Sequence, residues 1–141
     1  RLSLVGSEMC IRDRLRSLAV DFLDNGGGSG EEFCDYCQGD RDPRSSDNPE
    51  KAIISLKNDR ETGYKVYIAV QNELVAAYNV LRNREFARLY PNEGLTYVEA
   101  DLKYSDPRTS IDDKSDLKEK LDVIKSLYPQ KLSEAEPSKV N

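Results

Sequence analysis

The chain of 141 residues is long enough for one domain with a modest core. Its net charge of −5 argues against a nucleic-acid-binding protein, because such a protein normally presents a basic face. No stretch approaches the roughly 18 apolar residues of a membrane span, and residues 2–5 are too short for the apolar part of a secretory signal.

Residues 1–14, with the sequence RLSLVGSEMCIRDR, show neither a helical stripe nor the alternation of a strand. They resemble the translated adapter read-through found at the ends of assembled metagenomic fragments, and a short natural tail is the alternative. We therefore expect an artefactual or disordered tail here, with the true chain beginning near Leu15.

Residues 15–24 are predicted to form a short amphipathic helix, or the end of a longer one. Its apolar stripe consists of Leu15, Leu18, Ala19, Phe22 and Leu23. The glycine-rich run that follows Asn25 can supply a left-handed cap. The polar stretch that continues to Pro49 is longer than most connections inside a compact domain, so we expect a mobile insertion at about residues 25–50.

The centre of the chain predicts a strand, a turn and a helix. Adjacent Ile53 and Ile54, bounded by lysines, favour a strand over residues 52–57. A polar run ending at Gly63 follows, and then a helix over residues 64–82. The buried stripe of this helix is expected to contain Tyr67, Val70, Leu74, Ala77, Tyr78 and Leu81.

Residues 84–111 are ambiguous and are treated as a second mobile insertion, because the segment 97–100 is too short to assign. A second helix is predicted over residues 112–127, with Ser110 or Asp112 as its cap and Pro129 as its stop. Its stripe consists of Leu117, Leu121, Ile124 and Leu127 or Tyr128. A last strand at Leu132 and a tail at residues 138–141 complete the chain.

The order strand, helix, strand predicts an α/β fold of α+β character, in which helices pack on a short sheet. A connection of this kind between parallel strands is normally a right-handed β-α-β crossover. We therefore expect the strand at Leu132 to return beside the strand at 52–57.

Cys34 and Cys37 have the C-x-x-C spacing of redox and metal sites. A redox motif needs a strand before it and a helix after it. A zinc site would need two more ligands besides this pair, and Cys10 in a chain without histidine cannot supply a plausible set. We expect an incidental or bridging pair, with a local disulfide in an oxidising compartment. Replacing both cysteines by serine is then expected to alter the fold little.

Other candidate sites are weak. Residues 26–30 lack the strand, helix and Lys-Ser/Thr of a phosphate loop, so we interpret them as a linker. Asp40, Asp42 and Asp47 lack the glycine and terminal glutamate of an EF-hand and indicate a solvated acidic loop. Tyr67 and Tyr78 are expected in the core. We predict no catalytic, cofactor-binding or metal-binding residue, no cofactor, and a protein that is not an enzyme.

Two segments carry a family resemblance. Residues 58–82, NDRETGYKVYIAVQNELVAAYNVLR, are followed downstream by LYP at 127–129 and KLSEAEP at 131–137. Together they resemble the ExbD/TolR biopolymer-transport family, most closely the ExbD-like proteins of Bacteroidota. The resemblance runs from about Leu15 to Val140, with no match between 31 and 50 or between 84 and 115. It identifies residues 15–137 as an ExbD-like periplasmic domain.

The resemblance implies a membrane protein with one transmembrane helix and a small periplasmic α/β domain. That helix and the first strands of the domain would lie upstream of Leu15. The proton-carrying aspartate of the family lies in the missing helix, so no residue of this chain, Asp59 included, inherits that role. The implied location is the cell inner membrane, with this domain in the periplasm.

The resemblance also implies partners. It expects a homodimer inside a ring of ExbB/TolQ-like subunits, driven by the proton-motive force, that acts on a TonB/TolA-like protein. The strands at 52–57 and 131–134 offer a sheet edge for partner or self pairing. The alternative function is a soluble α/β protein-interaction module of an unrelated family, and a C-x-x-C redox protein comes third. Upstream sequence encoding about 20 apolar residues would favour the transport subunit.

Overall fold

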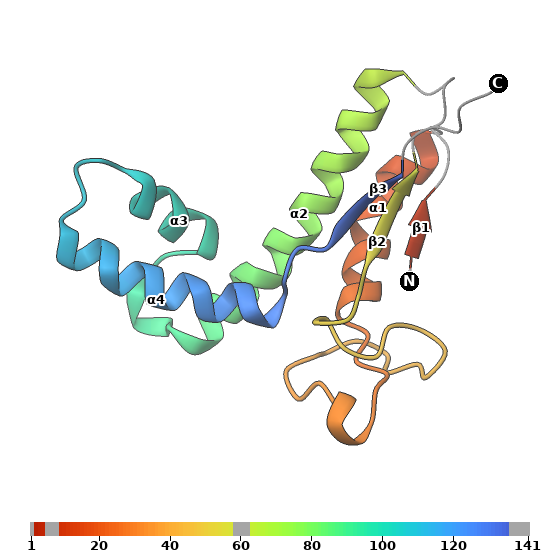
Figure 1. Ribbon diagram of the computed structural model, residues 1–141, viewed down its shortest axis with the longest axis horizontal. Helices are drawn as coiled ribbons and strands as arrows, with labels where there is room; N and C mark the ends of the chain where they lie inside the picture. Colours follow the sequence, from red (N-terminus) through yellow and green to blue (C-terminus); the bar gives the residue numbers. More distant parts are fainter. Residues whose placement is uncertain (1, 5–8, 58–62, 136–141) are drawn as a thin grey trace.

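The computed structural model describes residues 2–4, 9–57 and 63–135. Within these ranges, four α-helices combine with a small parallel sheet (Figure 1). The strands are β1 (Leu2–Leu4), β2 (Ile54–Lys57) and β3 (Leu132–Ala135). The helices are α1 (Met9–Leu23), α2 (Tyr64–Leu89), α3 (Tyr97–Ser105) and α4 (Ile111–Leu127), with short 3₁₀ helices η1 (Gly30–Glu32) and η2 (Pro91–Glu93) between them.

The sheet has the order β1-β2-β3, and both pairings are parallel. Ile54 aligns with Leu2 on one side and with Leu132 on the other. The prediction that Leu132 returns beside the central strand is therefore confirmed. The strand at 52–57 is also confirmed, although it begins at Ile54 rather than at Ala52.

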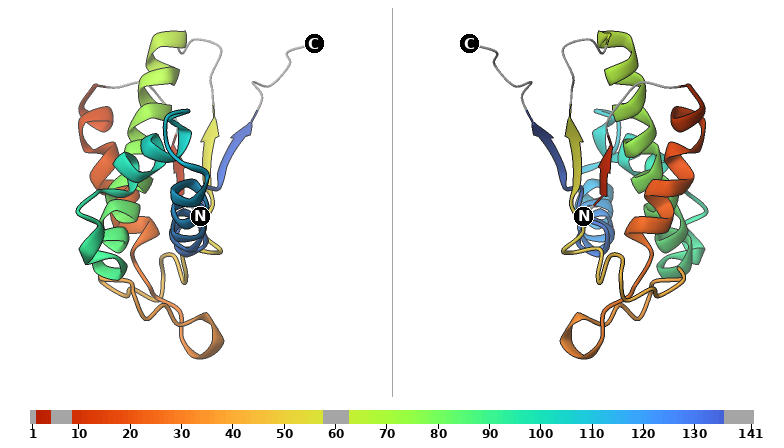
Figure 2. Two further views of the ribbon diagram at one scale, coloured as in Figure 1. Left: turned by 90° about the vertical axis from the view of Figure 1, so that its left-hand side faces the viewer. Right: turned by 90° about the vertical axis from the view of Figure 1, so that its right-hand side faces the viewer.

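The main core lies between the sheet and the pair α1 and α2, which both lie on one side of it (Figure 2). Leu74 and Leu81 on α2 are 0% and 1% exposed, as the periodicity of this helix predicts. Tyr78 is fully buried and Tyr67 packs partly buried against the same core, so both tyrosines are core residues as expected.

The N-terminal segment differs from the expectation of a disordered tail. Leu2–Leu4 pair with β2, and α1 begins at Met9, before the expected start at Leu15. This pairing joins residues about fifty positions apart, so the local pattern of the tail could not indicate it. Leu18 is 47% exposed, although it was expected in the buried stripe. An artefactual origin for residues 1–14 stays a prediction.

The segment 84–111 is not one long insertion. Helix α2 continues to Leu89, beyond the expected end at residue 82, and α3 follows. A capping box starts α3, because Thr96 Oγ1 accepts from the N–H of Glu99 at 3.1 Å and the Glu99 carboxylate accepts from the N–H of Thr96 at 3.1 Å. The prediction missed these helical residues because their apolar face is completed by other elements.

A second, smaller core explains that error. It joins the end of α2 to α3 and α4, which lie on the side of α2 away from the sheet (Figure 1). Its buried residues are Phe86, Tyr97, Ala100, Leu117, Leu121 and Ile124. Helix α4 matches its prediction to within one residue, and Ser110 is the cap, since its hydroxyl accepts from the N–H of Asp113 at 3.2 Å.

Candidate functional site

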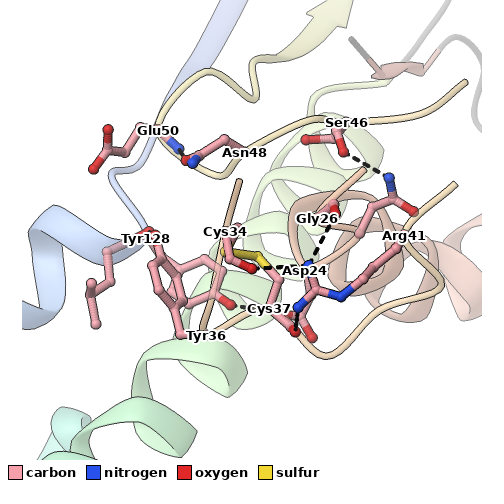
Figure 3. The surroundings of a disulfide bond; sticks show 12 residues. Asp24, Gly26, Cys34, Tyr36, Cys37, Arg41, Ser46, Asn48, Glu50 and Tyr128 are labelled. Carbon is pink, nitrogen blue, oxygen red and sulfur yellow. Dashed lines mark hydrogen bonds between the residues drawn. A yellow bond between two sulfur atoms is a disulfide. The ribbon is translucent and has the colours of Figure 1, made fainter. Parts of the chain in front are cut away.

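The loop between α1 and β2, residues 24–53, contains a disulfide between Cys34 and Cys37 (Figure 3). The two cysteines are 1% and 4% exposed. The bridging interpretation of this pair is confirmed. A buried disulfide is a poor candidate for catalytic thiol chemistry, which needs an accessible thiolate.

Arg41 is the central residue of this loop (Figure 3). Its Nη1 donates to the carbonyl oxygens of Cys34 at 3.0 Å and Gly26 at 3.3 Å, and its Nη2 donates to that of Cys37 at 2.7 Å. Its guanidinium also lies 4.9 Å from the ring centre of Phe33. Arg41 has a φ of 56°, a conformation that a non-glycine residue adopts only when its surroundings hold it there.

Asn25 organises the other half of the loop. Its Nδ2 donates to the carbonyl oxygens of Asp42 at 2.9 Å and Ser46 at 2.7 Å, and its Oδ1 accepts from the N–H of Asp42 at 3.1 Å. A Cβ added at Gly27 would lie 2.2 Å from the carbonyl oxygen of Asp42. The backbone of this region is packed and hydrogen-bonded, which differs from the open linker that its glycines suggested, and its mobility stays a prediction.

Tyr36, inside the disulfide-bonded turn, reaches the end of α4. Its hydroxyl donates to the carbonyl oxygen of Leu127 at 2.6 Å, and its ring meets that of Tyr128 edge-on at 5.5 Å between centres. Nη2 of Arg84 on α2 donates to the Tyr36 carbonyl oxygen at 3.3 Å. This turn thus connects the loop to α2 and to the junction between α4 and β3.

A buried polar network supports the same junction. Arg84 donates to both carboxylate oxygens of Asp24, at 2.7 and 3.0 Å, and the Tyr128 hydroxyl donates to Asp24 Oδ1 at 2.6 Å. Burial and then the neighbouring Asp24 carboxylate raise the pKa of Tyr128 above its ordinary value. Tyr128 therefore keeps its proton and remains a hydrogen-bond donor across the physiological pH range.

Helix α2 holds the junction from a second direction. Nε and Nη2 of Arg82 donate to the carbonyl oxygen of Tyr128, at 3.1 and 2.9 Å. The Tyr78 hydroxyl accepts from the N–H of Lys131 at 3.2 Å. The segment that leads into β3 is therefore fixed by buried side chains of α2.

Strand β3 is an edge strand, with β2 beside it and no further strand among the described residues. The N–H of Ile54 donates to the carbonyl oxygen of Lys131 at 3.0 Å. In a parallel ladder, alternate residues direct their backbone groups to opposite sides, so those of residues 132 and 134 face away from β2. This edge can accept an added strand.

The loop also carries exposed acids for which the described residues provide no ion pair. These are Glu31, Asp35, Asp40, Asp47 and Glu50. Asp42 differs, because hydrogen bonds from Arg44 lower the pKa of its carboxyl group. The described residues contain no group of acids or cysteines that could hold a metal ion. The solvated acidic loop predicted from Asp40, Asp42 and Asp47 matches this arrangement, whereas Asp59 lies outside the described residues.

A hollow of about 400 Å³ lies elsewhere, between the end of α2 and the start of α3. Its lining is mostly apolar, and its acid, Glu99, is engaged in the capping box.

No helix in the described ranges is both long and apolar enough to cross a membrane. Comparisons with protein-family models, with curated proteins and with solved structures found no match.

Sequence reasoning missed the residues that organise this region. Asp24, Arg41 and Arg84 are ordinary charged residues in the sequence, and no spacing marks them. Asp24 and Arg84 are 60 positions apart, and Asp24 and Tyr128 are 104 positions apart. The only local signal was the spacing of the two cysteines.

We expect stability to fall in alkaline solution. Burial, followed by nearby carboxylates, raises the pKa of Tyr36, and burial raises that of Tyr128. Their stabilising contribution is complete below the unfolded-state pKa of about 10 and is lost as the pH rises beyond it, because the unfolded tyrosines then ionise first. Urea unfolding at about pH 9 and about pH 11 measures this loss.

The control for this effect is Tyr64→Phe, because Tyr64 is 77% exposed. The double variant Tyr36→Phe, Tyr128→Phe should show a smaller fall between the two pH values than Tyr64→Phe does. Equal falls in the two variants would contradict the assignment.

Proposed function

We propose that this chain is the periplasmic portion of an ExbD/TolR-like subunit of an energy-transducing complex. The complex lies in the cell inner membrane and uses the proton-motive force for transmembrane transport of biopolymers. In this proposal the chain is not an enzyme and binds no cofactor. The proton-carrying residue lies in a transmembrane helix upstream of Leu15. Further strands of the domain also lie upstream.

The observation that carries the proposal is the paired resemblance at residues 58–82 and 127–137. In the described part of these segments, the two contact each other directly. Arg82 donates to the carbonyl oxygen of Tyr128, and the hydroxyl of Tyr78 accepts from the N–H of Lys131. The two segments that resemble the family therefore belong to one structural unit. This supports the family's domain better than two resemblances in unconnected parts of the chain would.

The fold is consistent with this proposal. Helix α2 covers the sheet and its far end continues into α3 and α4, after which the chain returns to β3 beside β2 (Figure 1). We assign this connection as a right-handed β-α-β crossover. The edge of β3 is the surface that we assign to pairing, either with a second copy or with an extended segment of a TonB/TolA-like partner.

The alternative is a soluble α/β interaction module of an unrelated family. The same edge strand and the acidic loop favour it equally, because both are surfaces for protein partners. The third candidate, a C-x-x-C redox protein, is disfavoured by the burial of both cysteines.

Extending the gene upstream tests the proposal. The extension should encode about 20 apolar residues that include one acidic residue. The full-length product, crosslinked in its own membrane, should be recovered with an ExbB/TolQ-like subunit and with itself. An extension without a membrane span, or a product that crosslinks to no such subunit, would favour the soluble interaction module instead.

The role of the edge is tested in the same crosslinking experiment. Glu134→Pro removes an N–H that faces away from β2, whereas the matched control Glu134→Thr keeps it. We expect the proline variant to lose most of its self or TonB/TolA-like crosslinks and to keep those to the ExbB/TolQ-like ring. Equal crosslinking by both variants would show that the edge is not the pairing surface.

A further inference from the structure

The disulfide-bonded turn lies where three parts of the chain converge (Figure 3). The end of α1 contributes Asp24, α2 contributes Arg84 and the end of α4 contributes Tyr128, and these three residues form one hydrogen-bonded network. Within the turn, Tyr36 contacts Arg84 on α2 and Tyr128 at the end of α4, so both contacts depend on the shape of the turn.

On the loop side, the turn is held mainly by Arg41. This residue binds the carbonyl oxygens of both cysteines and that of Gly26. A Cβ on Gly26 would lie 2.7 Å from the Cβ of Cys37, so the turn packs directly against the chain that leaves α1. The disulfide closes a ring of four residues and keeps this packed shape.

On the opposite side, Tyr36 holds the junction between α4 and β3. Its backbone is inside the disulfide ring, and its hydroxyl donates to the carbonyl oxygen of Leu127 at 2.6 Å. Strand β3 begins at Leu132, only a few residues later. The position of Tyr36 therefore links the oxidation state of the cysteines to the start of the edge strand.

We propose that the Cys34–Cys37 disulfide is a redox latch on the junction between α4 and β3. In the oxidised state, the ring fixes Tyr36 against Leu127 and Tyr128. In the reduced state, the four-residue turn regains its conformational freedom, the hydrogen bond of Tyr36 is lost and the junction loosens. Only a consequence for partner binding rests on the proposed function. The change in the junction itself needs no partner.

The reduction step is a thiol–disulfide exchange with a dithiol. One thiolate of the dithiol attacks a cysteine sulfur and breaks the bond between Cys34 and Cys37, which gives a mixed disulfide. The second thiolate of the dithiol then releases the other sulfur. The dithiol is oxidised to a disulfide, and the two cysteines take up two electrons and two protons.

Burial makes this exchange depend on opening of the loop. Both sulfurs are enclosed in the folded loop, and exposed carboxylates such as Asp35 and Asp40 repel an approaching thiolate. The closed loop therefore protects the disulfide, and the disulfide keeps the loop closed. This mutual dependence makes the turn a latch with two distinct states.

Amide hydrogen exchange of the 141-residue chain, measured with and without dithiothreitol, tests the latch. A thiol titration follows the reduction, and the Cys10→Ser background ensures that it counts only Cys34 and Cys37. We expect the amides of residues 33–41 and 128–135 to exchange about tenfold faster after reduction, as for loss of one buried hydrogen bond. The amides of α3 and of the first half of α4 should not change.

Two variants complete the test. Cys34→Ser with Cys37→Ser should match the reduced state and show no response to dithiothreitol. Tyr36→Phe should already exchange faster at 128–135 when oxidised, and reduction should then affect only residues 33–41. The latch is overturned if exchange at 128–135 is the same in the oxidised and reduced protein, or if excess dithiothreitol leaves the disulfide intact under native conditions.

Discussion

Replacing Arg84 by methionine is expected to lower the free energy of unfolding by about 3 kcal/mol. Arg84 donates to both oxygens of Asp24, whose side chain is 7% exposed. The variant leaves this carboxylate buried with the Tyr128 hydroxyl as its remaining side-chain donor. A buried charge that loses its counter-charge costs far more than the net value of the pair. Urea unfolding followed by circular dichroism measures the change.

The matched control is Arg44→Met. Arg44 also pairs with an aspartate, but its side chain is 88% exposed, so its loss should cost less than about 1 kcal/mol. The double variant Asp24→Asn, Arg84→Met should be more stable than Arg84→Met, because position 24 then no longer holds a buried carboxylate without its counter-charge. An Arg84→Met protein as stable as Arg44→Met would show that this network does not hold the loop to α2.

Replacing Leu74 by alanine is expected to lower the free energy of unfolding by about 3 kcal/mol. Leu74 is fully buried in the core that α1 and α2 form on the sheet. The substitution removes apolar contacts and leaves a cavity that a close-packed core fills only in part. For a domain of this size, such a loss is a large share of the total stability.

Val80→Ala is the control, because Val80 lies on the same helix and is 45% exposed. Its effect should stay within about 0.5 kcal/mol, since alanine is also the better helix former. Equal effects at the two positions would mean that α2 does not bury the face that its sequence pattern predicts.

The periodic elements were predictable because burial of one face repeats locally. Leu74 and Leu81 on α2, and Leu117 and Leu121 on α4, follow the 3.6-residue period and are buried. Adjacent Ile53 and Ile54 marked the strand, and Pro129 marked the end of α4. Each of these signals lies within a few residues of the element that it describes.

The second core was not predictable in this way. Phe86, Tyr97 and Ala100 form a continuous apolar surface only after three helices have come together. Helix α4 shows its own stripe, but the end of α2 and the short helix α3 each contribute too few apolar residues for a stripe to be evident, which is why residues 84–111 resembled an insertion. The capping box at Thr96 and Glu99 was the one local signal in that segment.

Local sequence thus accounts for the helices α2 and α4, for the central strand and for the capacity of Cys34 and Cys37 to form a bridge. The packing of the loop depends instead on distant partners. Arg41 keeps its positive φ while three carbonyl oxygens bind its guanidinium. Asp24 is paired because Arg84 of α2 and the hydroxyl of Tyr128, just after α4, both reach it. Polar side chains carry no periodic signal, so their partners emerge only when the chain has folded.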